Sequence, residues 1–290
     1  MIFWRILNDR VYPIQEVDAL GFEESEGMRI PDEYLKGGQF VLMRGCEGIG
    51  DWGIISAMPR LLKEKYPTCK VYVPSKKLLK KLWGTTHNNV EVIYKHNPYV
   101  DAFADSVEGD IYLDHYRVYD NQNTEVPLVK QMLKFWQFTD KEMEDYLPEI
   151  YWTKEEREFG DKIIDKYIYN DRNEFGCIMI SERFGQDNKT FKQKTYDDHL
   201  KKLKELISDN DYQYFYWSYK PIKEFDLKIH KALNLRHLDL RIQLYIKSKS
   251  KVDIGLQCGP NDSVCRYTKS LMIQRQYPLG GNFLDTIEYH

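Results

Sequence analysis

The sequence lacks the features that mark several common classes of protein. No apolar run reaches the roughly 18 residues that a membrane-spanning helix needs. Lys and Arg number 42 against 45 Asp and Glu, so the basic excess typical of a duplex-DNA-binding domain is missing. The five cysteines form no C-x-x-C pair, and the spacing of Cys258 and Cys265 suits neither a redox pair nor a zinc ribbon. We therefore expect reduced, mostly buried thiols and no structural metal.

What the chain does contain is enough apolar material for a large core. Of its 290 residues 42% are hydrophobic, which excludes a wholly disordered chain. The length fits one large domain or two ordinary ones. The opening residues have too short an apolar stretch for a signal peptide, so we expect a cytoplasmic protein.

Strands and helices alternate along the first half of the chain. Compact apolar runs predict strands, amphipathic runs predict helices, and Ser75 is placed to cap one of the helices. This alternation is typical of a parallel sheet. The expected strands are 39–44, 70–73, 90–94 and 110–113, and the expected helices are 54–66, 76–83 and 128–138.

The second half repeats the alternation after an extended connector at 147–152. Thr153, followed by Glu155 and Glu156, predicts the cap of a helix that runs to about residue 169. We therefore predict a first domain at 1–152, of which 1–38 is an extension or short hairpin, and a second domain at 153–290. Further expected strands are 177–180, 213–217 and 252–256, and further expected helices are 196–208, 225–233 and 264–273.

A glycine-rich turn follows the strand at 39–44. Its G-x-G-x-x-G spacing, from Gly48 to Gly53, matches the dinucleotide fingerprint, in which a helix start meets a phosphate. The acidic residue expected about 20 positions later is absent, because residues 73–77 read V-P-S-K-K. A Ser–Lys pair suits a 2′-phosphate, so an NADP-dependent oxidoreductase is one alternative. An ordinary tight turn of an α/β domain is another.

Asp51 lies inside this turn, at the start of the following helix. Free backbone amides and the helix dipole favour an ionised carboxylate there. The carboxyl edge of a parallel sheet is where open α/β folds bind ligands. An ionised carboxylate at that edge meets the requirement for a general base acting on a hydroxyl group. A simple helix cap is the structural alternative.

Three motifs in order resemble one enzyme family. They are G-I-G-D at 48–51, M-P-x-L-L-K-x-K-Y-P at 58–67 and N-P-Y-V-D at 97–101. The segment 40–103 is similar in these motifs and their spacing to the heptosyltransferase-like glycosyltransferases of family 9. The resemblance implies a GT-B-like fold, with two Rossmann-like α/β domains whose parallel sheets face a central cleft. It also implies inverting transfer of a sugar from a nucleotide-sugar to a glycan or glycolipid hydroxyl, as in polysaccharide biosynthesis, with no cofactor and no required metal.

The resemblance also assigns roles to residues of the first domain. Asp51 matches the turn aspartate of the family and is expected to be the catalytic base. The surrounding turn is expected to receive acceptor or donor phosphates. Independently of the resemblance, His115 follows the fourth strand and is expected from that position to touch the acceptor, with an ordinary loop as the alternative. The expected turn residues are Gly48, Gly50, Trp52 and Gly53.

The second domain matches the family less closely. Lys194 is the basic residue before a helix that would meet the donor diphosphate, and Asn261-Asp262-Ser263 matches a donor loop at a helix start. Val264 and Tyr267 stand where the family has Gly and His, so a non-catalytic descendant that binds a glycan or a partner protein is a further alternative. The remaining residues expected to contact the donor are Gly259, Arg266 and Ser218.

Two surface features complete the expectations. Lys76, Lys77, Lys80 and Lys81 lie on a basic helix that would suit peripheral contact with an anionic membrane, although a solvated helix face is the commoner explanation. His237-x-Asp239 has no third ligand in view, so no metal site is expected. We also expect no nucleic-acid partner.

Overall fold

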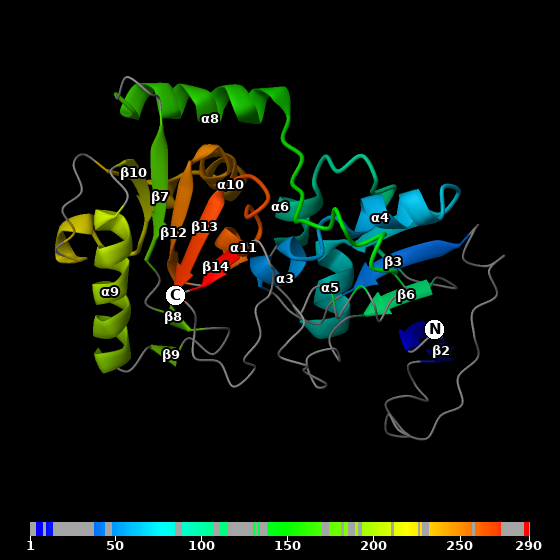
Figure 1. The fold of residues 1–290 in the computed structure, drawn as a ribbon. Coiled ribbons are helices and arrows are strands. Elements are labelled where there is room, and N and C mark those ends of the chain that lie inside the picture. The colour runs from blue at the N-terminus through cyan, green and yellow to red at the C-terminus, as the bar shows by residue number, and fades with distance from the viewer. Residues whose placement is uncertain are drawn as a thin grey trace. The chain divides into compact units, whose positions relative to one another are not determined.

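The chain folds into two compact units that divide between Leu147 and Pro148 (Figure 1). The sequence placed this boundary between 152 and 153. Each unit carries its own six-stranded sheet. The computed structural model describes Trp4–Leu7, Arg10–Pro13, 38–43, 48–84, 89–106, Ile111–Asp114, 130, 133, 138–169, 174–180, Arg183–Phe184, Lys189–Thr190, 193–209, 212–225, 227, 232–256, 259–273 and Ile287–Tyr289.

The sheet of the first unit has the strand order β2-β1-β6-β3-β4-β5. Its described pairs are parallel except for the β1–β2 hairpin. The hairpin is part of the sheet, because β1 pairs with β6. The strands are β1 Trp4–Leu7, β2 Arg10–Pro13, β3 Gln39–Met43, β4 Lys70–Pro74, β5 Ala102–Ala104 and β6 Ile111–Asp114.

Helices of the first unit follow β3 and β4 as the sequence predicts, but the segment after β3 differs in detail. There a short helix, a turn and a second helix replace the single helix expected at 54–66. The helices with both ends described are α3 Ile49–Gly53, α4 Met58–Lys65, α5 Lys76–Trp83 and α6 Asn89–Tyr94. The helix predicted at 128–138 lies mostly outside the described residues.

The segment 90–94 is helical, so the strand predicted there is wrong. Val90, Ile93 and Tyr94 are buried and Glu91 is exposed, which is the spacing of a helix face. A short apolar run does not by itself distinguish a strand from a buried helix. The strand that follows β4 along the chain and pairs with it is β5, which begins after the N-P-Y-V-D motif.

The second unit has a parallel sheet in the order β11-β10-β7-β12-β13-β14. Its strands are β7 Phe175–Met179, β10 Gln213–Trp217, β11 Leu233–Asn234, β12 Val252–Leu256, β13 Lys269–Ile273 and β14 Ile287–Tyr289, and β8 Arg183–Phe184 pairs separately with β9 Lys189–Thr190. The helices are α8 Lys154–Tyr167, α9 Gln193–Ser208, α10 Leu240–Lys249 and α11 Gly259–Asp262, with 3-10 turns η2 Ile222–Phe225 and η3 Leu235–His237.

Side chains of β10 alternate between two apolar layers. Tyr214 and Tyr216 pack in one core with α9 residues such as Leu203. Phe215 packs in the other with Ile242 and Ile246 of α10. Helices therefore cover both faces of the sheet, which is the doubly wound arrangement (Figure 1). The prediction that residues 213–217 form a core strand is confirmed.

Three helix predictions in this unit need correction. The segment 269–273 is strand β13, whose parallel pairing with β12 excludes the helix predicted at 264–273. Leu233 begins β11, which pairs with β10, so it does not end a helix. Helix α9 begins at Gln193, three residues before the start predicted at 196.

Two local capping predictions are confirmed. The Ser75 hydroxyl accepts a hydrogen bond from the Leu78 amide at the start of α5. Thr153 and Glu156 form a reciprocal capping box at the start of α8. Within the described residues, none of the helices is both long and apolar enough to cross a membrane.

Candidate functional site

The first candidate site is the turn between β3 and α3. Gly48 lies at the N-cap of α3 in extended conformation, and Asp51 is half-buried in the first turn of that helix. A Cβ atom added to Gly48 would fall on Oδ2 of Asp51. Because Gly48 has no side chain, the Asp51 carboxylate can fold back over the N-terminal end of its own helix. It occupies the space that a Cβ atom of residue 48 would fill.

Trp52, next to Asp51, faces the other way. Its ring is 1% exposed and packs edge-on against Tyr94, with 6.3 Å between the ring centroids. The ring contributes to the core of the first unit and does not line the turn, in contrast to the ligand contact expected for it. Gly53 is also buried, whereas Gly50 is half-exposed.

The backbone after Asp51 is held by hydrogen bonds from two tyrosine hydroxyls. The Ile54 amide donates to the Gly50 carbonyl at 2.9 Å, which closes the turn of helix that contains Asp51. The Tyr94 hydroxyl donates to the Ile55 carbonyl at 3.1 Å, and the Tyr146 hydroxyl donates to the Ile54 carbonyl. This segment of backbone is therefore fixed by partners from distant parts of the unit.

The other two motifs of the first unit are joined to one another. Lys63, from the second motif, contacts Asp101, from the third, at 2.6 Å. Asp101 also accepts from the Val71 amide at 2.8 Å and pairs with Lys70. Burial opposes ionisation of Asp101, but these hydrogen bonds outweigh it and lower the pKa of the carboxyl group. The second and third motifs are therefore bound to each other at the edge of the sheet. The carboxylate that lies at the turn is that of Asp51, from the first motif.

Ser75 and Lys77, the pair that would suit a 2′-phosphate, are engaged with a carboxylate. The Ser75 hydroxyl donates to Asp105 at 2.6 Å, and Lys77 pairs with Asp105 at 3.0 Å. An NADP phosphate would have to displace Asp105 from both. The contacts here thus favour a structural role for the pair.

The second candidate site, Asn261-Asp262-Ser263, is largely buried. Asn261 and Ser263 are 0% exposed and Asp262 is 6% exposed. The Ser263 amide and hydroxyl both reach the Gly259 carbonyl, at 3.0 and 2.7 Å. The expectation of a helix start at Ser263 with amides open to phosphate is therefore wrong. The helix here, α11, begins at Gly259 and ends at Asp262.

Arg266 and Tyr267 attach the inter-unit connector to the second unit. Arg266 pairs with Glu149 at 2.7 Å. The Tyr267 hydroxyl accepts from the Ile150 amide at 3.1 Å, and its ring packs edge-on against Trp152. Tyr267, which departs from the family pattern, thus has a clear structural role.

The other predicted donor residues are placed as follows. Ser218 is 0% exposed, and its hydroxyl accepts from the Lys220 amide at 3.1 Å. Lys194 is the second residue of α9 and so does not precede the helix. His115 lies outside the described residues, as does the side chain of Lys194.

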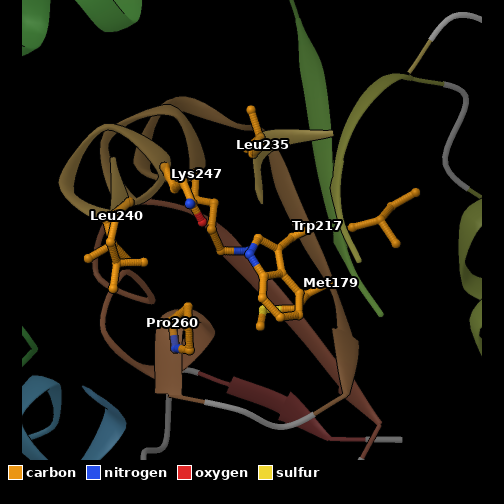
Figure 2. Close-up of a pocket in the computed structure, with 9 residues that line it drawn as sticks. Met179, Trp217, Leu235, Leu240, Lys247 and Pro260 are labelled. Carbon is orange, nitrogen blue, oxygen red and sulfur yellow. The ribbon is translucent and has the colours of Figure 1, made fainter. Parts of the chain in front are cut away.

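A hollow at the carboxyl edge of the second sheet was missed by the sequence reasoning. The free volume between its side chains is about 10 Å³, which is room for about one water molecule. Met179 ends β7 and Trp217 ends β10, and they lie across the hollow from Leu240 and Pro260 (Figure 2). The available signal was position, because Trp217 ends the strand predicted at 213–217 and Met179 lies one residue before the end of the strand predicted at 177–180. The remaining lining residues are Ile178, Leu235, Gln243, Leu244 and Lys247.

Lys247 connects the hollow to a buried carboxylate. It is 4% exposed and contacts Asp253, which is 0% exposed, at 2.5 Å. Burial raises the pKa of Asp253 although the Lys247 ammonium opposes this shift. Among the described residues, no cluster of three or more His, Cys, Asp or Glu is placed to hold a metal ion.

Comparison with known proteins supports the fold. Neither a protein-family model nor a curated protein matches the chain. A family 9 glycosyltransferase structure from Veillonella parvula aligns over 88% of this chain and 86% of its own, with 9% identity and a TM-score of 0.60. E. coli ADP-heptose lps heptosyltransferase II aligns over 87% and 92%, with 10% identity and a TM-score of 0.46. The dodecameric iron-containing heptosyltransferase TibC, in complex with ADP-D-beta-D-heptose, aligns over 95% and 66%, with 9% identity and a TM-score of 0.49.

The first of these similarities confirms the fold expected from the motifs. Both units are α/β with parallel sheets, and the chain shares its architecture with a family 9 glycosyltransferase along most of both lengths. The resemblance first seen in residues 40–103 thus extends to the second unit, where the sequence motifs are weakest. The chain has a GT-B-like fold of two Rossmann-like units.

Proposed function

We propose that the protein is an inverting glycosyltransferase that moves a sugar from a nucleotide-sugar to a hydroxyl acceptor. The observation that carries the proposal is the position of Asp51. Its half-buried carboxylate follows a central parallel strand, at the edge where α/β sheets bind ligands, on a fold shared with a family 9 glycosyltransferase. The carboxylate lies over Gly48, in the space that a side chain there would fill, and the residue stays half-exposed.

The reaction is a single displacement. Asp51 accepts the proton of the acceptor hydroxyl while that oxygen forms a bond to the anomeric carbon. The bond from the anomeric carbon to the diphosphate breaks at the same time, and the nucleoside diphosphate leaves with the electron pair. Attack from the side opposite the leaving group inverts the configuration. The absence of a side chain at Gly50 favours access of the acceptor to Asp51.

The donor belongs to the second unit in this proposal. The hollow formed by Met179, Trp217, Leu240 and Pro260 is apolar and lies at the edge where α/β sheets bind ligands, and we propose that these side chains move apart to admit a nucleotide base. Gly259, Asn261, Asp262 and Ser263 shape the adjoining loop through internal hydrogen bonds. Lys194, Arg266 and Ser218 stay as proposed donor residues, with the positive charge that a diphosphate leaving group requires coming from Lys194.

The finer parts of the proposal concern metal, acceptor and location. We propose that no metal is required, that the acceptor is a glycan or glycolipid of the cytoplasmic side, and that His115 contributes to its binding. One face of α5 would support peripheral contact with an anionic membrane, because it carries four exposed lysines, Lys76, Lys77, Lys80 and Lys81.

The test is a panel of ligands followed by turnover. Unfolding temperature is measured with UDP, GDP, ADP, CMP and NADPH, with and without EDTA. A ligand at ~100 times its dissociation constant stabilises the folded protein by about 2.7 kcal/mol. We expect a shift with one nucleotide that EDTA leaves unchanged, and release of that nucleotide from its sugar conjugate when acceptor is added. A shift with NADPH alone would overturn the proposal, and binding without turnover would indicate a non-catalytic protein.

A further inference from the structure

Helix α3, which carries Asp51, is too short to be stable alone. It has five residues, and isolated helices below ~12 residues are marginal in water. Its position must therefore be set by its surroundings. The packing of Trp52 fixes one side, and hydrogen bonds to the backbone carbonyls that follow Asp51 fix its end.

Those carbonyls are bonded by tyrosine hydroxyls in the interior of the unit. Tyr94 is 1% exposed and Tyr146 is 6% exposed, and Ile54 and Ile55 are each 1% exposed. Little water can reach these carbonyls, so a lost hydroxyl is poorly replaced and leaves a buried acceptor without its partner.

The contact of Tyr146 leads to Asp51 through two hydrogen bonds. The Tyr146 hydroxyl donates to the Ile54 carbonyl, and the Ile54 amide donates to the Gly50 carbonyl at 2.9 Å. Gly50 precedes Asp51 in the chain. A displacement of Ile54 therefore moves the helical turn that holds the Asp51 carboxylate.

We propose that Tyr146 is a positioning residue for Asp51, which it controls through the Ile54 carbonyl. This inference rests on the proposed function, since it presumes that Asp51 acts on the acceptor. Tyr146 lies just before the division at Leu147 and Pro148. The segment after α3 is therefore held by a residue of the first unit that lies next to the connector. Tyr94, whose hydroxyl reaches Ile55, supports the same turn from α6.

The second unit offers a matched control. Its end of the connector is held by the hydroxyl of Tyr267, which contacts the backbone of Ile150. Tyr146→Phe and Tyr267→Phe thus each remove one tyrosine hydroxyl that bonds backbone atoms, one in each unit. Of these two hydroxyls, that of Tyr146 is linked through described hydrogen bonds to the turn that holds Asp51.

The experiment measures kcat and KM of Tyr146→Phe, Tyr267→Phe and Asp51→Asn well below their unfolding temperatures. We expect kcat of Tyr146→Phe to fall about 10- to 100-fold, because a misplacement of about 1 Å has effects of that size. KM for the nucleotide-sugar and the nucleotide-induced shift should stay within about twofold, and Tyr267→Phe should keep its kcat within about twofold. A purely structural role of Tyr146 would lower the unfolding temperature and leave kcat intact.

Failure of this inference is distinct from failure of the proposed function. If Asp51→Asn turns over like the wild type, the base assignment is lost and the positioning role with it. If Asp51→Asn is inactive and Tyr146→Phe keeps its kcat, only the positioning role is overturned. Should Tyr146→Phe not fold, hydrogen exchange on the wild type decides. Amides of residues 52–57 should then exchange as slowly as those of α4, and exchange at the rate of an open loop would refute the role.

Discussion

The carboxyl edges of the two sheets carry similar polar sequences with opposite outcomes. In the first unit Asp51 follows β3 and keeps a half-buried carboxylate beside two glycines. In the second, Asn261-Asp262-Ser263 follows β12 and is buried. The Ser263 hydroxyl bonds the carbonyl of Gly259, and the Asn261 amide group bonds the sulfur of Met272 at 3.0 Å.

The difference shows that a polar residue near a helix start has two uses. Turned outward, it meets a ligand. Turned inward, it satisfies the backbone of its own loop, and such local bonds compete with ligand binding for the same atoms. In the first unit we propose that one side chain, that of Asp51, performs the chemistry. In the second unit the proposed binding surface is the apolar hollow around Trp217. The variants below test whether chemistry and binding are divided between the units in this way.

The largest expected effect is that of Asp51→Asn. Loss of a general base lowers kcat by about 10²- to 10⁴-fold. The nucleotide-induced shift in unfolding temperature should persist, because the proposed donor site is in the other unit. Glu64→Gln, at an exposed carboxylate of α4 that pairs with Arg60, is the control and should keep wild-type kcat. Equal loss in both variants would mean that the effect is not chemical.

Lys247→Met and Lys63→Met compare the stability contributed by the buried ion pair of the second unit with that contributed by an ion pair of the first unit. Removing Lys247 leaves Asp253 buried without its cation, and breaking such a pair costs about 3–5 kcal/mol of unfolding free energy. Lys63→Met should cost about 1 kcal/mol or less, since Lys63 and Asp101 are 21% and 22% exposed and Asp101 keeps Lys70. Urea unfolding measures both.

A double variant sharpens that comparison. Lys247→Met combined with Asp253→Leu removes both buried charges, and apolar replacement of a buried pair is often close to neutral. The double variant should therefore be more stable than Lys247→Met alone. A double variant as unstable as the single one would show that packing, and not the unpaired carboxylate, causes the loss.

Gly48→Ala and Gly84→Ala separate two uses of glycine in the first unit. The added Cβ at Gly48 would displace the Asp51 carboxylate, so we expect kcat to fall about tenfold or more. Gly84 ends α5 at φ 71° with open space around it. Alanine there should lower the unfolding free energy by about 1 kcal/mol and leave kcat unchanged. An unchanged kcat in Gly48→Ala would remove the spatial argument for this turn.

The sequence predicted features whose cause is local. Ser75 and Thr153 bond to amides three residues away, and such contacts leave a short pattern in the chain. The sequence failed where a distant partner decides. The segment 269–273 is a strand because β12 lies beside it, and 90–94 is a helix because its buried face packs in the unit.

The candidate site shows the same limit. The Asp51 turn was predictable because β3, the glycines and the carboxylate are contiguous in sequence. The roles of Tyr94 and Tyr146 were not, since each lies more than 35 residues from the carbonyl that it bonds. The inward orientation of Asn261 depends on its contact with Met272 of β13, which no short motif encodes.

The smallest expected effect is an opposite pH dependence of two aspartates. The pKa of Asp101 is lowered, so its contribution to stability is present above the ordinary value of 3.8 and is lost as pH falls through the lowered value. The pKa of Asp253 is raised by burial, so its contribution is present below 3.8 and is lost as pH rises through the raised value. The stability of the wild type relative to Asp101→Asn should therefore increase with pH, and that relative to Asp253→Asn should decrease. Chemical unfolding from about pH 3 to pH 6 gives both slopes. Slopes of the same sign would contradict the contrast between an accessible, hydrogen-bonded carboxylate in the first unit and a desolvated one in the second.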